Sequence, residues 1–316
     1  MKIVDHIKTA KKPFVSFEIL PPIKGKGIQA VYDIVDPLMQ FEPPFIDVTY
    51  HREEFIYKKR ESGYFEKTAI RKRPGTVAIC AAIISKYKID AVPHIICGGF
   101  SKQETENALI DLCFLGIDNV LVLRGDPAKH EPRFTPHKYG HNYAVDLVKQ
   151  INDMNHGAYL DDTAGNHQSN FCIGVAGYPE KHFEAPNINM DLQFLKTKVD
   201  QGAEYIVTQL FFDNQKYYDF VRDCREIGID VPIIPGLKPI TKKSQISILP
   251  SIFHVDIPKE LTDWVHKAKS EEEIKEIGTT WLINQSKDLI LNGAPSLHYY
   301  TMGDIATISK VVKDTF

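Results

Sequence analysis

The sequence has few cysteines and no pattern that would pair them. Its 316 residues include five cysteines, an odd number, and no two of them form a Cys-x-x-Cys motif. Scattered thiols of this kind are typical of a reducing compartment and argue against a disulfide framework or a cysteine-based zinc site. We therefore expect free, buried thiols in a cytoplasmic protein.

Long apolar runs and an excess of positive charge are also missing. The strongest apolar run, residues 77–84, is far shorter than the roughly 20 residues of a membrane span. The first twenty residues lack the apolar core of a signal peptide. Lys and Arg number 38 against 41 Asp and Glu, for a net charge of -3, whereas nucleic-acid binders usually carry a basic excess. We expect neither a membrane nor a nucleic acid as a partner.

What the sequence does contain is a regular alternation of two kinds of segment. Hydrophobic residues make up 43% and charged residues 25%, as in ordinary globular domains. Runs rich in β-branched and aromatic residues predict strands at 14–20, 45–50, 92–97, 119–123, 171–176, 205–212, 231–235 and 296–300. Helical spacing of apolar residues predicts helices at 28–40, 76–87, 101–115, 143–155, 189–201 and 215–227, and two or more within 242–291. The polar stretch 157–170 is predicted to be an exposed loop.

This alternation predicts the fold class. A strand followed by a helix and another strand implies parallel strands joined by helical crossovers. Eight such units close into an α/β fold of the (β/α)8 type, the TIM barrel, and an open doubly wound sheet is the competing architecture. No linker or change of composition divides the chain, so we expect a single domain over residues 1–316 with extra helices around 242–291.

Polar residues stand at or near the carboxyl ends of the predicted strands, where barrel enzymes place their active sites. In chain order they are Glu18, Thr49, His94, Arg124, Asp126, Tyr178, Gln209, Lys238 and Tyr300.

Glu18 carries the clearest chemical signal among them, because it interrupts a strand that is expected to be buried. Burial raises the pKa of a carboxyl group toward the range of a general acid, although an ion pair with a neighbouring Arg or Lys would also explain it. Asp126 lies in a Gly-Asp-Pro turn that could be purely structural. Gln209 could bind a heterocycle or make an internal hydrogen bond, and His94 resembles a hydrogen-bonded core histidine.

Two other patterns are weaker than they look. Residues 25–30 match G-x-G-x-x-A, but Pro21 and Pro22 separate them from the preceding strand, which argues against a dinucleotide fingerprint. His130, His137 and His141 lie in a polar loop without an acidic cluster, so we predict no metal site.

Nine motifs follow one another over nearly the whole chain. They are Phe17-Glu18-Ile19-Leu20-Pro21-Pro22, Asp47-Val48-Thr49-Tyr50, Pro93-His94-Ile95-Ile96-Cys97, Leu123-Arg124-Gly125-Asp126-Pro127, Ala176-Gly177-Tyr178-Pro179-Glu180, Lys198-Val199-Asp200-Gln201-Gly202-Ala203, Thr208-Gln209-Leu210-Phe211-Phe212-Asp213, Ile234-Pro235-Gly236 and His298-Tyr299-Tyr300-Thr301. In this order they resemble the methylenetetrahydrofolate reductase family.

The resemblance implies a (β/α)8 barrel that binds FAD and uses NADH or NADPH to reduce 5,10-methylenetetrahydrofolate to 5-methyltetrahydrofolate for methionine synthesis, with both substrates using one site in turn. It implies that Glu18 protonates the folate, and that Asp126 hydrogen-bonds the pterin and influences the flavin. Gln209 and Tyr300 would complete the substrate site. FAD contacts are implied for Thr49, His94, Arg124, Gly125, Asp126, Ala176, Tyr178, Asp191 and Lys198.

The sequence also departs from the family pattern. Residues 51–55, His-Arg-Glu-Glu-Phe, replace small residues and glycine, so flavin contacts or nicotinamide access there are expected to differ. The loop at 157–170 is longer than in short bacterial forms, and we expect no regulatory domain. A homo-oligomer is expected from the exposed barrel helices. A Schiff-base aldolase using Lys238 or Lys198, or a catalytically silent binding protein, are the alternative functions.

Overall fold

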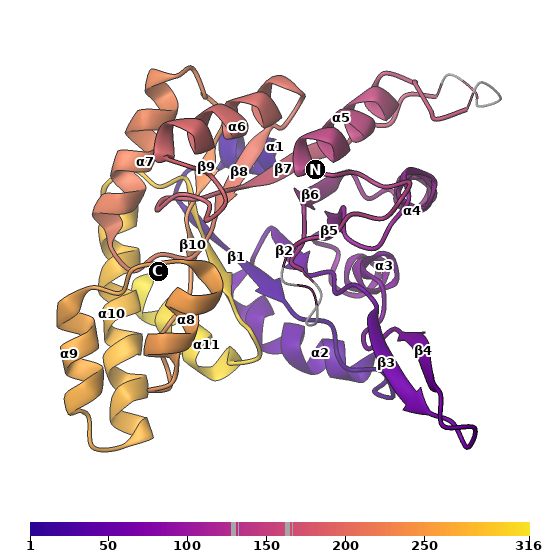
Figure 1. Ribbon diagram of the computed structural model, residues 1–316. Helices are drawn as coiled ribbons and strands as arrows, with labels where there is room; N and C mark the ends of the chain where they lie inside the picture. Colours follow the sequence, from indigo (N-terminus) through magenta and orange to yellow (C-terminus); the bar gives the residue numbers. More distant parts are fainter. Residues whose placement is uncertain (128–130, 132, 162–164, 166) are drawn as a thin grey trace.

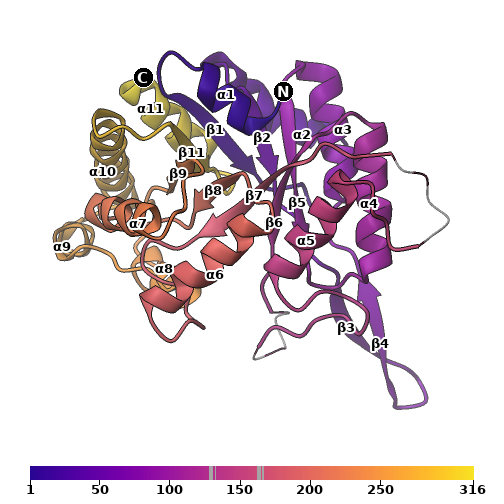
Figure 2. The ribbon, with the colours of Figure 1, turned by 90° about the horizontal axis from the view of Figure 1, so that it is seen from above.

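Nine parallel strands form one sheet at the centre of the molecule (Figures 1 and 2). The computed structural model describes residues 1–127, 131, 133–161, 165 and 167–316. The sheet has the order β10-β11-β1-β2-β5-β6-β7-β8-β9. Its strands are β1 (Phe14–Ile19), β2 (Phe45–Val48), β5 (Asp90–Ile96), β6 (Asn119–Leu123), β7 (Cys172–Gly177), β8 (Tyr205–Thr208), β9 (Ile233–Ile234), β10 (Gly236–Leu237) and β11 (Ser296–Tyr300).

Two of these strands are halves of one barrel position. Only Pro235 separates β9 from β10, and a proline has no N–H to continue a ladder. The first half pairs with β8 and the second with β11, which in turn pairs with β1. The Pro235 carbonyl accepts a hydrogen bond from the backbone N–H of His298 at 3.0 Å. The sheet therefore closes on itself with eight positions, which confirms the predicted (β/α)8 barrel over the open sheet.

Helices surround the barrel, as Figure 2 shows from above. They are α2 (Gln29–Val35), α3 (Thr76–Tyr87), α4 (Lys102–Phe114), α5 (Ala144–Asn155), α6 (Ile188–Asp200), α7 (Asn214–Glu226) and α11 (Ile305–Thr315), with α8 (Gln245–Phe253), α9 (Lys259–Lys267) and α10 (Glu271–Leu291) as the extra group. The predicted helix at 28–40 is α2 followed by a 3-10 turn, η1 (Asp36–Phe41). In the part of the chain that is described, no helix combines the length and apolar character needed to cross a bilayer.

Local signals explain where several helices begin and end. Ser101 caps α4 in a capping box with Glu104, as the sequence predicts. Gly116 follows the same helix with φ +68, a conformation that favours glycine. Predicted and observed bounds agree to within a few residues for most elements, including Thr76–Tyr87 and Ser296–Tyr300 without any difference.

The sequence analysis missed an antiparallel hairpin, β3 (Glu54–Lys59) and β4 (Phe65–Ile70), which projects from the body in Figure 1. One face of the hairpin is exposed, the other is partly exposed, and none of its residues is buried, so the sequence shows no run of buried residues. The hairpin begins within the segment that departs from the family pattern. Helix α11 and the short helix α1 (Ile3–Thr9) were likewise not predicted from the sequence.

Helix α1 closes the amino-terminal end of the barrel. Its Ile3 and Val4 pack in a buried cluster with Phe45, Tyr205 and other residues near the beginnings of the strands. Gly174 makes room for the Tyr205 ring, because a Cβ at this position would lie 2.2 Å from it. The barrel is thus filled and closed at this end, and its polar residues gather at the carboxyl ends of the strands.

Candidate active site

Glu18 lies inside the barrel near the carboxyl end of β1, beside Asp47 of β2 and Tyr300 of β11 in the strand register. Its nearest ionisable partner is a histidine and not the Arg or Lys that the alternative reading of the sequence required. Oε2 of Glu18 lies 3.5 Å from Nε2 of His94, and the same nitrogen lies 3.7 Å from Oδ2 of Asp47. Three ionisable side chains from three strands therefore share one small volume.

Burial controls the proton affinity of this cluster. It raises the pKa of Glu18 from 4.5 to about 7, an effect that His94 opposes and Asp47 reinforces. Burial likewise raises the pKa of Asp47 from 3.8 to about 7, against the influence of His298. The pKa of His94 is lowered by burial, with Glu18 opposing. Near neutral pH the carboxyl groups can hold protons while His94 is neutral, which is the state a general acid needs.

A second group of predicted residues lies at the ends of β6 and β7 and on α6. Arg124 forms an ion pair with Glu184. Lys198 donates a hydrogen bond from Nζ to the carbonyl of Ala176 at 2.8 Å. Burial lowers the pKa of Lys198 from 10.5 to about 8, and Asp191 opposes this change. These contacts make a partly buried cationic region.

Tyr178 and Tyr300 connect the two groups. Burial raises the pKa of Tyr300, and Glu18 and Tyr178 both add to the effect, so Tyr300 lies within electrostatic range of each. Burial also raises the pKa of Tyr178. Asp191 and Asp126 add to this increase, and Arg124 opposes it. The Tyr300 hydroxyl donates a hydrogen bond to the carbonyl of Thr208 at 2.6 Å. The predicted residues of the two groups therefore surround one continuous region.

The remaining predicted residues border the same end of the barrel. Thr49 donates from Oγ1 to the carbonyl of Ile19 at 3.0 Å. Gly125 has φ +84, which favours glycine, and exposed Asp126 follows it. Gln209 accepts a hydrogen bond at Oε1 from the backbone N–H of Leu210 at 2.9 Å.

Lys238, one of the alternative Schiff-base lysines, is buried and donates to the carbonyl of Pro239 at 3.3 Å. Burial lowers its pKa, and the charged group that opposes this is Asp304.

A lower layer of polar side chains was not predicted. Asp47 and His298 are 1% and 0% exposed, and each stands two positions before a predicted site residue, Thr49 or Tyr300. Side chains two positions apart lie on the same face of a strand, so the spacing was the signal that could have found them. Ser16, two positions before Glu18, donates or accepts at 2.9 Å from Nδ1 of His298.

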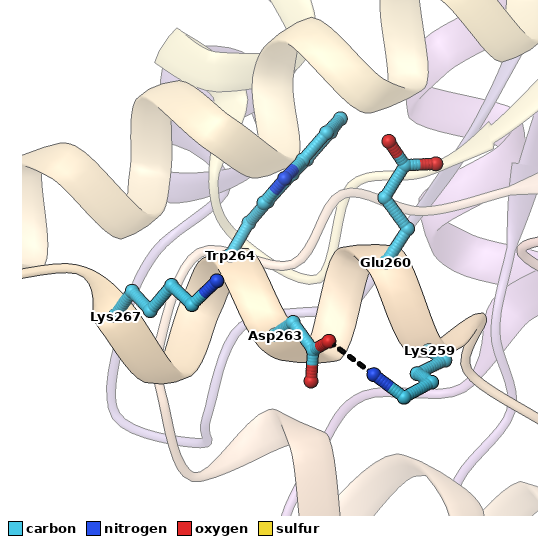
Figure 3. A pocket seen from close by; sticks show the side chains of 5 residues that line it. All are labelled: Lys259, Glu260, Asp263, Trp264 and Lys267. Atoms are coloured by element: carbon cyan, nitrogen blue, oxygen red, sulfur yellow. Dashed lines mark hydrogen bonds and ion pairs between the residues drawn. The ribbon is translucent and has the colours of Figure 1, made fainter.

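Two cavities differ sharply in their surroundings. One of about 370 Å³ lies against α9 and is lined by Lys259, Glu260, Asp263, Trp264 and Lys267. Figure 3 shows these side chains rising from a single helix, with Lys259 paired to Asp263. No barrel strand contributes to this lining, so we assign it no role in the site.

The other cavity, of about 330 Å³, borders the active-site cluster through His94. Ile95, Ile96, Phe100 and the beginning of α3 line it with mostly apolar surface. Within the described residues no group of three or more His, Cys, Asp or Glu could hold a metal ion, and His130 lies outside them.

The whole chain matches one family model. The model described as "Methylenetetrahydrofolate reductase" covers residues 2–315. This chain belongs to the methylenetetrahydrofolate reductase family.

Individual family members are similar over most of this chain. Methylenetetrahydrofolate reductase 2 of Saccharomyces cerevisiae is 32% identical over 306 residues, which cover 95% of this chain and 46% of the yeast protein. Methylenetetrahydrofolate reductase (NADH) 1 of Arabidopsis thaliana is 33% identical, over 96% of this chain and 48% of its own length. The 5,10-methylenetetrahydrofolate reductase of Escherichia coli is 30% identical, over 91% of this chain and 86% of its own length. The chain thus spans about half the length of its eukaryotic relatives and most of the bacterial one.

A solved structure supports the fold independently. An uncharacterized protein from Clostridium thermocellum, described as binding two copies of 5-methyl-5,6,7,8-tetrahydrofolic acid, superimposes with a TM-score of 0.57. The alignment covers 98% of this chain and 96% of that chain at 12% sequence identity. At this identity the similarity is one of fold alone.

Proposed function

We propose that this protein reduces 5,10-methylenetetrahydrofolate to 5-methyltetrahydrofolate with NADH or NADPH, in two half-reactions that share one site and one FAD. The observation that carries the proposal is Glu18, a largely buried acid with a pKa of about 7 at the carboxyl end of a barrel of this family. The product would supply methyl groups for methionine synthesis. Relatives are named for NADH in Arabidopsis thaliana and for NADPH in Caenorhabditis elegans, so the donor for this chain is left to experiment.

Two cationic side chains at the carboxyl end of the barrel support the binding of FAD there. Arg124 and Lys198 both act on the pKa of His182, which burial lowers to about 4, so two cations converge on one neighbourhood. A guanidinium and an ammonium group suit a diphosphate. Gly125 has a conformation that favours glycine and lets the backbone come close to a ligand.

The remaining contacts with FAD would come from residues that border the same end of the barrel, namely Thr49, His94, Ala176, Tyr178, Asp191 and Asp126. Bound FAD would supply the hydride chemistry, which amino acid side chains do not provide.

Glu18 would act as the general acid. Its proton would go to N10 of the folate, so that the five-membered ring opens to an electrophilic iminium. The fraction of Glu18 that is protonated at pH 7 is about one half with a pKa of about 7, against roughly 0.3% for a carboxyl group with a pKa of 4.5. Burial therefore increases the concentration of the active acid by roughly 150-fold.

Asp126, Gln209 and Tyr300 would bind the substrate around this acid. The Gln209 amide offers a donor and an acceptor that match a pterin edge, and Asp126 offers acceptors. Tyr300 is held by its hydrogen bond to Thr208, so its ring has a fixed position beside Glu18.

The visible absorption spectrum of the purified protein tests the proposal. We expect a flavin spectrum that bleaches on anaerobic addition of NADH or NADPH and returns on addition of methylenetetrahydrofolate. A protein that carries no flavin and cannot take up FAD contradicts the proposed function. If neither NADH nor NADPH reduces the bound flavin, FAD remains the cofactor, and the electron donor must be another protein.

Substitution separates the two half-reactions. Glu18→Gln should abolish reoxidation by the folate and leave flavin reduction by the nicotinamide largely intact. Glu180→Gln is a matched control, because burial also raises the pKa of Glu180 to about 7. The Oε2 atom of Glu180 accepts a hydrogen bond from the backbone N–H of Asp256 and not from a group of the Glu18 cluster. The control should keep both half-reactions.

A Schiff-base enzyme is the second candidate, because the pKa of Lys198 is lowered to about 8. Borohydride reduction in the presence of a carbonyl substrate would trap an adduct on this lysine. Absence of any adduct, together with flavin turnover, decides for the reductase.

A further inference from the structure

The polar layer beneath Glu18, formed by Asp47, His298 and Ser16, is unusual because the carboxyl group of Asp47 has no hydrogen-bond partner among the described residues. Both carboxyl oxygens of Asp47 and the Nε2 atoms of His94 and His298 are buried without a hydrogen bond to any described residue. Buried polar groups are nearly always paired, so each exception calls for a functional or structural reason. Family resemblance assigned no role to Asp47 or His298.

One nitrogen lies between the two carboxyl groups. Nε2 of His94 is 3.5 Å from Oε2 of Glu18 and 3.7 Å from Oδ2 of Asp47. Each contact must shorten by about 0.5 Å to reach hydrogen-bond distance, and catalytic hydrogen bonds often tighten in this way when the substrate binds. The nitrogen can therefore contact the two oxygens in turn.

The groups that face Asp47 come from every side of the barrel. Burial raises the pKa of Cys80 and of Tyr205 well above their ordinary values, so these two stay protonated near neutral pH. Burial does the same for Tyr300. The groups around Asp47 whose charge can change near neutrality are Glu18 on β1, His94 on β5 and His298 on β11.

We propose that Asp47 stores a proton for Glu18 and that His94 carries it from one carboxyl group to the other. After Glu18 has given its proton to the substrate nitrogen, the O–H bond of Asp47 breaks and an N–H bond forms at Nε2 of His94. That N–H bond then breaks, and an O–H bond forms again at Oε2 of Glu18. The net change is one proton moved from Asp47 to Glu18.

His298 would stabilise the negative charge that the transfer leaves on the carboxylate of Asp47. It lies within electrostatic range of Asp47, and its Nδ1 is held by Ser16 at 2.9 Å. Asp47, His94 and His298 are thus positioning and proton-transfer residues, whereas Glu18 contacts the substrate. The inference rests on the proposed function in that Glu18 is taken as the acid.

Infrared spectroscopy of the flavin-loaded wild-type protein tests the storage directly, without turnover. The carbonyl band of protonated carboxylic acids should be present at pH 6 and decrease with a midpoint near pH 7. Part of this band should be lost in Asp47→Asn, a separate part in Glu18→Gln and a third part in Glu180→Gln, because the pKa of Glu180 is also raised to about 7. A wild-type protein with no such band at pH 6 overturns the proposal, and this measurement needs no variant to fold.

The pH profile of the folate half-reaction tests the transfer. Asp47→Asn keeps the shape of the side chain but has no acidic proton, so its turnover should fall several-fold at pH 6 to 7, where Asp47 of the wild type holds a proton, and should approach the wild-type value at pH 9, where wild-type Asp47 has lost it. Flavin reduction by the nicotinamide should be unchanged. Ser286→Ala is the control, since it removes a buried hydroxyl that is hydrogen-bonded to Tyr299 at 2.8 Å, away from the cluster.

The outcomes separate the two proposals. An Asp47→Asn variant with the wild-type pH profile overturns proton storage while the reductase function stands. A wild-type protein that does not reduce the folate overturns the proposed function, and the infrared bands still show whether Asp47 holds a proton.

Discussion

Replacing Glu18 with glutamine should change how the stability of the protein depends on pH. The folded protein keeps the Glu18 proton up to about pH 7, because burial raises the pKa of this group from 4.5 to about 7. The unfolded chain releases the proton near pH 4.5. The stabilising contribution is therefore complete below pH 4.5 and is lost as the pH rises to about 7, at about 1.4 kcal/mol per pH unit.

The size of the effect follows from this interval. The full loss is about 3.4 kcal/mol, and it is an upper value because 16% of the Glu18 side chain is exposed. Glutamine has a similar shape and does not ionise. Between pH 5 and pH 8 the free energy of unfolding of Glu18→Gln should therefore gain about 2.5 kcal/mol relative to the wild type.

Urea denaturation at pH 5, 6, 7 and 8 measures this difference for both proteins. Ser286→Ala, which removes a buried hydroxyl group that does not ionise in this range, should give a difference that does not vary with pH. A flat difference for Glu18→Gln as well would refute the reasoning, since it would mean that Glu18 ionises alike in the folded and unfolded states. The assay uses neither folate nor nicotinamide, so it tests the buried acid apart from the proposed reaction.

Three further changes have defined outcomes. Gly174→Ala should lower the free energy of unfolding in urea by about 1–3 kcal/mol, because the new Cβ would overlap the ring of Tyr205, and unchanged stability would contradict this packing. Arg124→Gln should reduce the flavin retained after gel filtration, since the guanidinium is proposed to bind the diphosphate; full retention would remove Arg124 from the site. Among the five thiols, Cys113 is only partly buried and should react first with a thiol reagent in the folded protein, whereas the four buried thiols should react on unfolding. Equal rates for all five would show that the barrel does not protect them.

The fold could be predicted because the barrel strands are buried on both faces. Such strands appear in the sequence as short apolar runs, and 119–123 and 296–300 were predicted with the bounds that the structure has. The hairpin of β3 and β4 has no buried face, so neither an apolar run nor a clear alternation marks it. The sequence predicts the seventh strand at 231–235, whereas the structure divides it around Pro235, a break that depends on pairing with two different neighbours.

The upper layer of the site could be predicted for a different reason. Glu18 and Tyr300 lie at strand ends, where barrels place functional groups, and the structure brings them together. Asp47 lies within a strand and before its end, so its position in the sequence does not mark it as a site residue. Its environment depends on His94 and His298, which are distant from it in the sequence. Only the closed barrel places these side chains together.

The closure of the barrel by α1 has a consequence for isotope exchange. Ile3 and Val4 fill the amino-terminal end, so water reaches the interior from the end where Glu18 lies. A ligand bound across that end would separate the buried acids from the solvent. Hydrogen held on Asp47 would then stop exchanging with deuterium for as long as the ligand stays, and the isotope on this carboxyl group would remain that of the water in which the protein was equilibrated before binding.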